Sequence, residues 1–273
     1  MSLSRIKSIV IAMLLLINAF FLTIIVFGKY ADARDERQEL EDLCAILQSN
    51  GITISPDSVK SVDAIRTMRT ARGVEQEAIV ANALLDQSDM TVRSSIYLYE
   101  NAERGSAEFS SGGDFKIWMH EGIMTNASGT LKTVQEILRN MRLEISMFIV
   151  SVEPDTEMVV AVSAYRGASI FNCTVDFVFE NGSLITVAGR YVTGFEPAED
   201  GVEISSVGTA LMGFLAAVKR EDIECTEIQS VEAGYIYSIV GSFGEGVISP
   251  VWMVTTSNGR HVVDSATGEI RLI

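Results

Sequence analysis

A long apolar run near the N-terminus constrains this chain more than any other feature. Residues Ile9–Phe27 read IVIAMLLLINAFFLTIIVF, with no charged side chain and only Asn18 and Thr23 as polar positions. A bilayer core of about 30 Å needs about 20 helical residues at about 1.5 Å each, so the run is long enough to span a membrane. We therefore expect a transmembrane signal anchor over residues 9–28, after a cytoplasmic tail over residues 1–8.

A cleavable secretory signal peptide is the alternative interpretation of the same run. Ala31-Asp32-Ala33 offers the small-x-small pattern of a cleavage site. The apolar core of a signal peptide is usually about 7–15 residues long, however, and Lys29 lies between this longer run and the site. An uncleaved anchor is therefore favoured. A short tail before a long acidic region favours a single-pass protein of the cell membrane, with a cytoplasmic N-terminus and an extracellular C-terminal domain.

The charge of the chain excludes some classes of partner. The formal net charge is −15, and Arg5 and Lys7 are the only charged residues in the first 28 positions. The remaining chain carries 19 basic against 36 acidic residues. Phosphate backbones require clustered Lys and Arg, so we expect no nucleic-acid partner.

Helical patterns and short strand patterns alternate beyond the apolar run. Asp35–Leu47 is charged and amphipathic, and Asn50-Gly51 is a typical helix end. The apolar side of this helix consists of Leu40, Leu43, Ile46 and Leu47. Further helices are expected over Glu75–Leu85 and Thr130–Met141, and a third from an N-cap at Ser205-Ser206 to about Val218. In the Thr130 helix the apolar face is Leu131, Val134, Ile137, Leu138 and Met141.

Period-two patterns rich in β-branched and aromatic residues predict strands. The expected strands are Ile52–Ile54, Val92–Tyr99, Ala107–Phe109, Phe115–Trp118, Ile145–Val152, Met158–Ala164, Asn172–Glu180, Leu184–Tyr191, Ile223–Ser230, Tyr235–Val240, Pro250–Thr256, Arg260–Asp264 and Ile270–Ile273. Asn181-Gly182-Ser183 is expected to be a turn. Asn258-Gly259 predicts a type I′ hairpin turn with positive φ at both residues.

The order of these elements predicts the α+β class, with two lobes that each combine antiparallel sheet and helix. We expect a juxtamembrane helix over residues 29–50, a first α+β lobe over residues 51–128 and a second over residues 129–273. The division falls in a Gly-, Ser- and Asn-containing stretch without periodicity.

Motifs of catalysis and metal binding are not recognisable in the sequence. Cys44, Cys173 and Cys225 lack CxxC spacing and nearby His, so a zinc site is not expected, although one disulfide bridge stays open as an alternative to buried thiols. His120 and His261 fit no ligand motif, and His261 is expected to be an exposed hairpin residue. The N-x-S/T patterns at Asn126, Asn172 and Asn181 matter only in a host that glycosylates. We therefore expect no enzyme activity, cofactor or metal.

The apolar run offers one candidate binding surface. At 100° per residue, small residues fall on one narrow stripe, and Asn18 lies on an adjoining face where it can hydrogen-bond across helices. Small residues let helices approach closely in lipid, so the stripe predicts a helix–helix interface; chance occurrence of small residues in a single span is the alternative. The candidate interface residues are Ser8, Ala12, Leu15, Asn18, Ala19 and Thr23.

Three segments resemble the YycH/YycI family of Gram-positive bacteria, and in particular its YycI branch. The first is SRIKSIVIAMLLLINAFFL, a short basic tail before one span. The second is AYRGASIFNCTVDFVFENGSLITVAGRYVTG. The third runs from SSVGTALMGFLAAVKREDIECTEIQSVEAGYIYSIVG to ISPVWMVTTSNGRHVVDSATGEI, which orders a helix, a strand, a GYxY strand and a hairpin. The resemblance covers the span and residues 140–273, whereas residues 36–125 agree only in layout.

This resemblance implies a regulatory role. Proteins of the family are membrane-anchored, and they associate with one another and with the sensor histidine kinase of the WalK/WalR (YycG/YycF) two-component system, which controls cell-wall metabolism. The resemblance therefore implies a sensor kinase and a YycH-like protein as partners. The C-terminal hairpin is also similar to PepSY-type domains. An extracytoplasmic PepSY-like binding or protease-inhibitor module is thus the alternative function.

Overall fold

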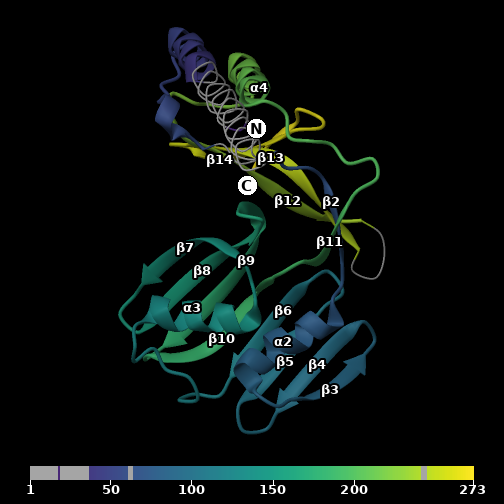
Figure 1. Cartoon of the computed structure of the whole chain (residues 1–273). Coiled ribbons are helices and arrows are strands. Elements are labelled where there is room, and N and C mark those ends of the chain that lie inside the picture. The colour runs from purple at the N-terminus through teal and green to yellow at the C-terminus, as the bar shows by residue number, and fades with distance from the viewer. Residues whose placement is uncertain (1–17, 19–36, 61–63, 241–244) are drawn as a thin grey trace, which may run out of the picture.

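The computed structural model describes residue 18 and residues 37–60, 64–240 and 245–273. Its strands form one mixed sheet system, and helices pack on its faces (Figure 1). This arrangement confirms the α+β class. The expected span over residues 9–28 lies outside the described residues, apart from Asn18. In the part of the chain that is described, no helix combines the length and apolarity needed to cross a bilayer.

One structural unit occurs twice in succession in the middle of the chain. Helix α2 (Val74–Leu85) precedes an antiparallel meander of β3 (Asp89–Arg93), β4 (Ile96–Asn101), β5 (Gly105–Phe109) and β6 (Asp114–Met119). Helix α3 (Thr130–Met141) then precedes a second antiparallel meander of β7 (Ile145–Val152), β8 (Thr156–Tyr165), β9 (Ala168–Glu180) and β10 (Ser183–Arg190). Each helix has 12 residues. The chain therefore repeats a helix-plus-four-strand unit.

The last strands of the two units pair with each other and fuse their meanders into one sheet. β6 and β10 are antiparallel, with Ile117 opposite Val187. Helices α2 and α3 contact each other and cover the same face of this sheet (Figure 1). Their apolar sides close a core with the strands, in which Leu84, Met141 and Phe177 are fully buried. We call this part the α2/α3 lobe.

A third copy of the unit forms the core of the other lobe. Helix α4 (Val207–Lys219) precedes β12 (Ile228–Ile239), β13 (Gly246–Thr256), β14 (Gly259–Asp264) and β15 (Ile270–Leu272), again an antiparallel meander. The Ser206 side chain caps α4 by accepting a hydrogen bond from the Thr209 N–H at 3.2 Å, as expected. Two further strands, β2 (Met68–Ala71) and β11 (Thr193–Pro197), extend the sheet beside β13. We call this part the α4 lobe.

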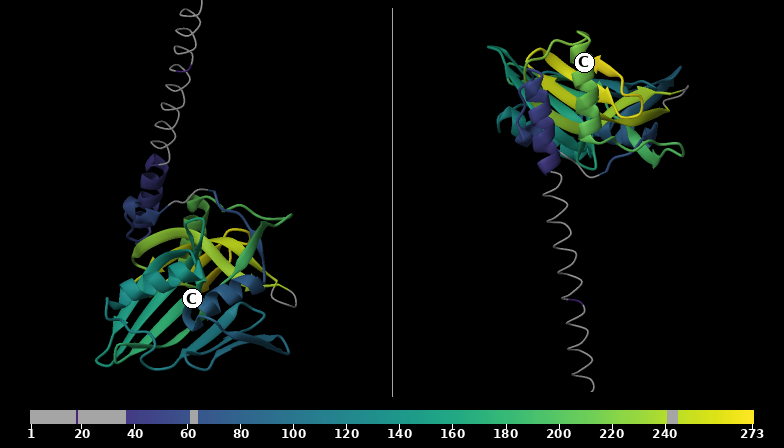
Figure 2. Two further views of the ribbon diagram at one scale, coloured as in Figure 1. Left: turned by 60° about the horizontal axis from the view of Figure 1, so that its bottom comes forward. Right: turned by 90° about the horizontal axis from the view of Figure 1, so that it is seen from above.

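The segment that follows the apolar run in sequence is built into the α4 lobe. A helix over residues 37–49 lies beside α4 on one face of the sheet (Figure 2). Leu43 and Leu47 of this helix are buried in the same cluster as Phe214. The short helix η1 (Pro56–Ser58) leads into β1 (Val59–Lys60), which pairs in parallel with β12. Ile46, expected on the apolar side, is 45% exposed, because the packed side is the narrower stripe of Leu43, Cys44 and Leu47.

The two largest of the three hydrophobic clusters among the described residues divide the chain differently from the expected boundary at residues 128 and 129. One cluster runs from α2 to Tyr191, and the other combines residues 43–68 with residues 168–173 and 210–270. Strand β9 contributes to both: Ile170 lies in the α4 cluster and Phe177 in the α2/α3 cluster. The two lobes thus share one long central strand.

Several local predictions are confirmed. Helix α3 and strand β7 have the expected bounds. The predicted helix end at Asn50-Gly51 is confirmed by the positive φ of Gly51, 85°. The predicted turn between β9 and β10 is confirmed by the positive φ values of Asn181 and Gly182, 49° and 76°. Leu131 is the exception on α3, because it is 39% exposed while Thr133 takes a buried position.

Other local predictions are wrong. Val92–Tyr99 is not one strand, because Ser94 adopts a φ of 57° and turns the chain between β3 and β4. The two strands expected over Ile223–Ser230 and Tyr235–Val240 are one strand, β12, which continues through Gly234. Because Gly234 has no Cβ, Ser169 O can approach its backbone closely: this oxygen lies 2.6 Å from the position that a Cβ would occupy.

The final hairpin is confirmed, but its turn is not type I′. Thr256 pairs with Gly259, so Ser257 and Asn258 form the loop, and Asn258 does not have a positive φ. The Thr256 hydroxyl accepts the Asn258 N–H at 3.2 Å, and Asn258 Nδ2 donates to Glu224 O at 3.0 Å. These side-chain bonds hold the turn one residue earlier than expected.

Candidate functional site at the junction of the two lobes

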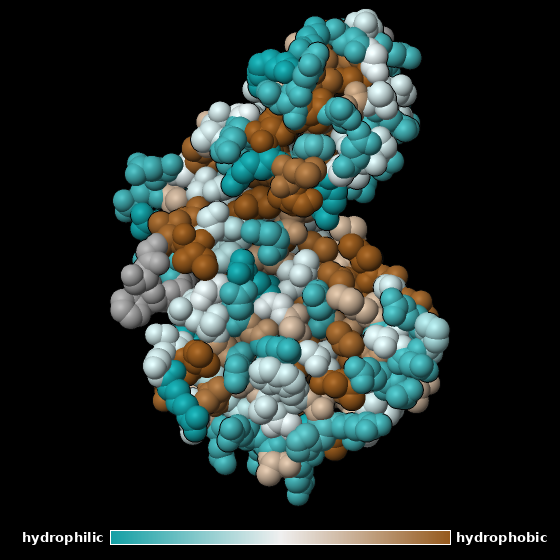
Figure 3. All heavy atoms as spheres, turned by 180° about the vertical axis from the view of Figure 1, so that it is seen from behind, coloured by the Kyte–Doolittle hydropathy of each residue, from teal (hydrophilic) through white to brown (hydrophobic). Residues whose placement is uncertain are grey.

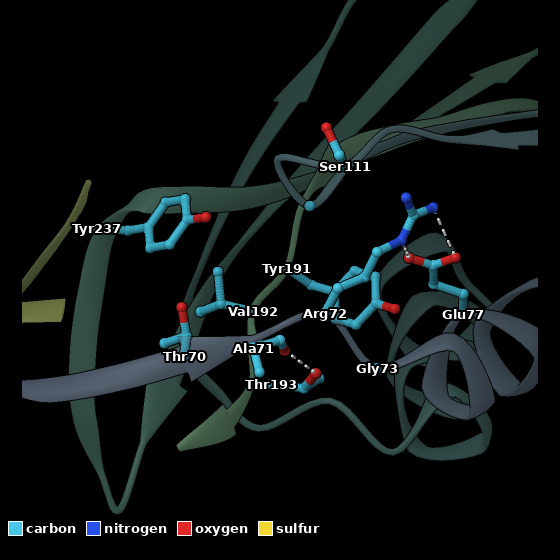
Figure 4. A pocket seen from close by; sticks show the side chains of 11 residues that line it. Thr70, Ala71, Arg72, Gly73, Glu77, Ser111, Tyr191, Val192, Thr193 and Tyr237 are labelled. Carbon is cyan, nitrogen blue, oxygen red and sulfur yellow. Dashed lines mark hydrogen bonds and ion pairs between the residues drawn. The ribbon is translucent and has the colours of Figure 1, made fainter. Parts of the chain in front are cut away.

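Two chain segments connect the lobes and enclose a small polar cavity. Arg72 and Gly73 join β2 to α2, and Tyr191 and Val192 join β10 to β11. Together with Tyr237 of β12 they line a cavity of about 20 Å³ (Figure 4). A cavity of this size holds about one water molecule, so it cannot bind an organic ligand.

Arg72 organises this junction. Its guanidinium group donates to both carboxylate oxygens of Glu77, with Nε–Oε1 at 2.5 Å and Nη2–Oε2 at 3.0 Å (Figure 4). The side chains of Arg72 and Glu77 are only 13% and 3% exposed. Arg72 also donates to Phe109 O at 3.2 Å and to Ser95 O at 3.0 Å, and its guanidinium lies 4.2 Å from the ring centre of Tyr97. One side chain from the connecting segment thereby binds α2, β5 and the turn before β4.

Buried hydroxyl groups lie near the cavity and the ion pair. Among the described residues, Tyr99 Oη and Thr70 Oγ1 are buried without a hydrogen-bond partner. Burial, with a smaller contribution from the negative charge of Glu77, raises the pKa of both Tyr99 and Tyr191. These phenols therefore stay protonated at neutral pH. The described residues that line the cavity include no Ser–His or Cys–His pair. The bonds of Arg72 to α2, β5 and the turn before β4 join these elements, and we call this arrangement the Arg72 lock.

The predicted interface residues lie almost entirely outside the described residues. Of the candidate stripe, only Asn18 is described, as an exposed helical residue. Ser8, Ala12, Leu15, Ala19 and Thr23 fall in the segments that are not described. The stripe therefore stays a prediction.

His261 is not the exposed hairpin residue that the sequence predicts. It lies on β14, is only 6% exposed, and meets the ring of Phe214 on α4 edge-on at a centroid distance of 5.5 Å. Its Nδ1 has no partner among the described residues, and burial lowers the pKa of the imidazole. The prediction fails because α4 covers this strand from a distant part of the sequence. His120, in contrast, is exposed.

The three cysteines are free and buried. Burial raises the pKa of Cys173 to about 12, so its thiol is a small apolar core residue, as expected. Across residues 37–60, 64–240 and 245–273, no group of three His, Cys, Asp or Glu side chains is arranged to hold a metal ion.

Asn172, one of the three N-x-S/T positions, joins two strands. Asn172 donates from Nδ2 to Tyr237 O and accepts the Tyr237 N–H on Oδ1, both at 2.8 Å. This pair of bonds joins β9 to β12 where the two lobes meet. The sequence predicted neither this amide nor the Arg72 lock, because both depend on partners that are distant in the chain or outside helical spacing.

Comparisons with known proteins support the fold alone. No protein-family description and no curated protein matches the chain. Among solved structures, an uncharacterized protein from Eubacterium rectale ATCC 33656 is similar with a TM-score of 0.52 and 12% identity, over 81% of this chain and 89% of that chain. The C-terminal domain of Bacillus megaterium YpeB has a TM-score of 0.38 and 13% identity, over 75% of this chain and 99% of that chain.

Proposed function

We propose that this protein is a membrane-anchored, non-catalytic regulator of a sensor histidine kinase of the WalK/WalR type, with residues 9–28 as its membrane anchor. The proposal combines the sequence resemblance to the YycH/YycI family with the acidic character of the chain beyond the apolar run. Its bulk would lie outside the cell, and a YycH-like protein would be a second partner.

The observation that carries the proposal is the integration of residues 37–60 into the α4 lobe. Leu43 and Leu47 are 8% and 0% exposed in its core, and β1 adds a strand to β12, where Lys60 Nζ lies 2.6 Å from Glu232 Oε1. Burying two leucines contributes about 1.5–3 kcal/mol each relative to leaving them in water. The chain is therefore fixed to the lobe from residue 37 onward, nine residues after the end of the proposed anchor, and this short spacing supports a role in which the anchor and the lobe act together.

In the proposed mechanism the anchor contacts the kinase within the membrane. The stripe of Ser8, Ala12, Leu15, Ala19 and Thr23 would pack against a kinase helix, with Asn18 hydrogen-bonding beside it. Such contacts change signalling only if they differ between the two states of the kinase. A differential energy of a few kcal/mol, about 5 at most, is enough to reverse its population.

The test compares two enlargements of the proposed anchor helix. Ala12→Leu with Ala19→Leu fills the stripe, whereas Val10→Phe with Ile17→Phe enlarges the opposite face and serves as the matched control. All four substitutions keep or raise the apolarity of the span, so membrane insertion is expected to be unchanged. Kinase association, measured by in-cell crosslinking, should fall several-fold for the first variant and remain at the native level for the control. Equal association of both variants with the kinase would contradict the stripe.

A PepSY-like binding or inhibitor module is the second candidate, and the uncovered sheet face favours it. The face of the α2/α3 lobe opposite its helices shows exposed hydrophobic side chains among polar ones (Figure 3). Trp118 and Ile149 are 37% and 49% exposed. If crosslinking survives the filled stripe but is lost when residues 64–273 are deleted, recognition lies outside the membrane and this second function is favoured.

A further inference from the structure

A groove of about 290 Å³ lies between the lobes, beside the Arg72 junction. The α2/α3 lobe contributes Gln76 from α2, Arg142 and Glu144 after α3, and Ser163 and Tyr165 from β8. The α4 lobe contributes Phe195 from β11. Its volume lies at the lower end of the range of small-molecule sites, so a ligand of amino-acid size would fill it.

One polar group in the groove has no partner in the protein. Ser163 is only 7% exposed, and within the described residues its Oγ makes no hydrogen bond. A buried hydroxyl without a partner costs free energy, and native proteins usually pair such groups. Ser163 lines the groove but its hydroxyl oxygen is itself covered, so a rotation of this side chain would let a ligand with a hydrogen-bonding group supply the missing partner.

The groove also has an aromatic wall built from both lobes. The rings of Tyr165 and Phe195 stack with centroids 4.2 Å apart and planes 30° apart. Arg166 lies next to this pair, with its guanidinium carbon 5.4 Å from the Tyr165 ring centre. Such a wall favours a flat apolar group on the ligand.

The charge at the groove is unusual for so acidic a chain. Arg142 lines the groove, and none of the ion pairs formed by the described residues involves Arg142 or Arg166. Glu144 is the opposing charge, but its two oxygens already accept the backbone N–H groups of Arg166 at 3.1 Å and Gly167 at 2.6 Å. Backbone N–H groups are neutral, so Glu144 keeps its negative charge. The groove is thus lined by one cation, Arg142, and one anion, and the cation Arg166 lies beside its aromatic wall.

Arg142 occupies a backbone position that normally selects glycine. It ends α3 in the left-handed region with φ 57°, and its N–H donates to Leu138 O and Arg139 O. Glycine adopts this conformation without steric cost but would remove the side chain from the groove. An arginine at a strained position that also lines the groove fits a role for the guanidinium group.

We propose that the inter-lobe groove binds a small carboxylate attached to an aromatic or flat apolar group. The carboxylate would pair with Arg142 and accept from Ser163 Oγ, and the apolar group would lie against the Tyr165–Phe195 wall. Free aromatic acids and the C-terminal end of a peptide share this chemistry. The inference is independent of the proposed anchor contact with a kinase.

The test uses the full-length chain in detergent micelles and isothermal titration with four probes. N-acetylphenylalanine carries both features, its amide lacks the charge, acetate lacks the ring, and the peptide Ala-Ala-Phe presents the same end on a chain. We expect saturable binding of the acid. The amide should bind at least about tenfold more weakly because a charge-assisted hydrogen bond is stronger than a neutral one, and acetate should do so because it has no ring to lie against the aromatic wall. Tighter binding of Ala-Ala-Phe than of the acid would identify a peptide end as the ligand, and the reverse order a free acid.

Two variants and one matched control complete the test. Arg142→Gln and Phe195→Ala should each weaken binding of the acid about tenfold. Arg139→Gln, three residues earlier on the exposed side of α3, should leave it unchanged. Circular dichroism establishes that each variant is folded. Equal affinity for acid and amide, equal affinity of Arg142→Gln and Arg139→Gln, or no saturation below about 10 mM would overturn the proposal.

Discussion

Removing the Arg72 guanidinium should strongly destabilise the protein. In Arg72→Met the Glu77 carboxylate, 3% exposed, would lose both of its hydrogen-bond donors and stay buried. Breaking a buried ion pair by deleting one partner costs about 3–5 kcal/mol, because the remaining charge is uncompensated. We take about 3 kcal/mol, because the Arg72 side chain is still 13% exposed and water can partly replace it.

Urea unfolding measures this loss. With an m-value of roughly 2–3 kcal/mol/M, a loss of about 3 kcal/mol lowers the midpoint by about 1 to 1.5 M. The double variant Arg72→Met with Glu77→Leu removes both charges and replaces them with apolar side chains. It should recover most of the lost stability, because a hydrophobic replacement of a buried pair is often neutral or stabilising.

The double-mutant cycle decides between a buried pair and a merely crowded site. A coupling free energy of about 2 kcal/mol or more between the two positions is expected for charges that compensate each other. A single-variant loss below about 1 kcal/mol, or a double variant as unstable as the sum of the two single variants, would refute the assignment of Arg72 and Glu77 as the lock of the junction.

Two further predictions concern backbone contact and protonation. Gly189→Ala should destabilise the folded protein by at least about 2 kcal/mol, because the added Cβ would lie 2.1 Å from Thr174 O. At Gly213 on α4 an added Cβ meets nothing within 4 Å, so Gly213→Ala should stabilise the protein by up to about 1 kcal/mol. Thermal unfolding of the two variants measures both effects. Burial lowers the pKa of folded His261, so the unfolded chain binds its proton more readily and stability should fall as pH drops below the unfolded value of about 6.5. His261→Leu should flatten this loss between pH 7 and 5 in urea titrations, and an unchanged slope would contradict the burial of a neutral imidazole.

Local patterns predicted the elements that depend on local chemistry. Helix α3 follows from apolar spacing, and the β9–β10 turn follows from Asn181 and Gly182, which tolerate the positive φ that a tight hairpin needs. The predictions failed where distant elements decide. His261 lies in a strand that reads as half polar, but α4 buries it, and Ser94 turns the chain without a Gly or Asn signal.

Local sequence patterns could not predict the threefold repeat or the Arg72–Glu77 contact either, because both depend on how distant elements are arranged. Strand β9 has 13 residues where its counterpart β5 has 5, so the repeated units have different lengths and no visible sequence period. Arg72 and Glu77 are five residues apart across a helix start, which is not a helical pair spacing. Their contact exists only because β4, β5 and α2 meet around the guanidinium group.

The groove and the proposed anchor are joined through the α4 lobe, and this arrangement has a thermodynamic consequence. Phe195 lines the groove from that lobe, while Leu43 and Leu47 fix the helix over residues 37–49 to the core of the same lobe. A ligand that changes how the lobes meet would therefore also change the position of this helix. Binding free energies are linked, so if kinase association alters the affinity for the acid by some factor, the acid must alter kinase association by the same factor. Titrating the acid with and without bound kinase measures that factor, and a factor of one would show that the groove and the anchor act independently.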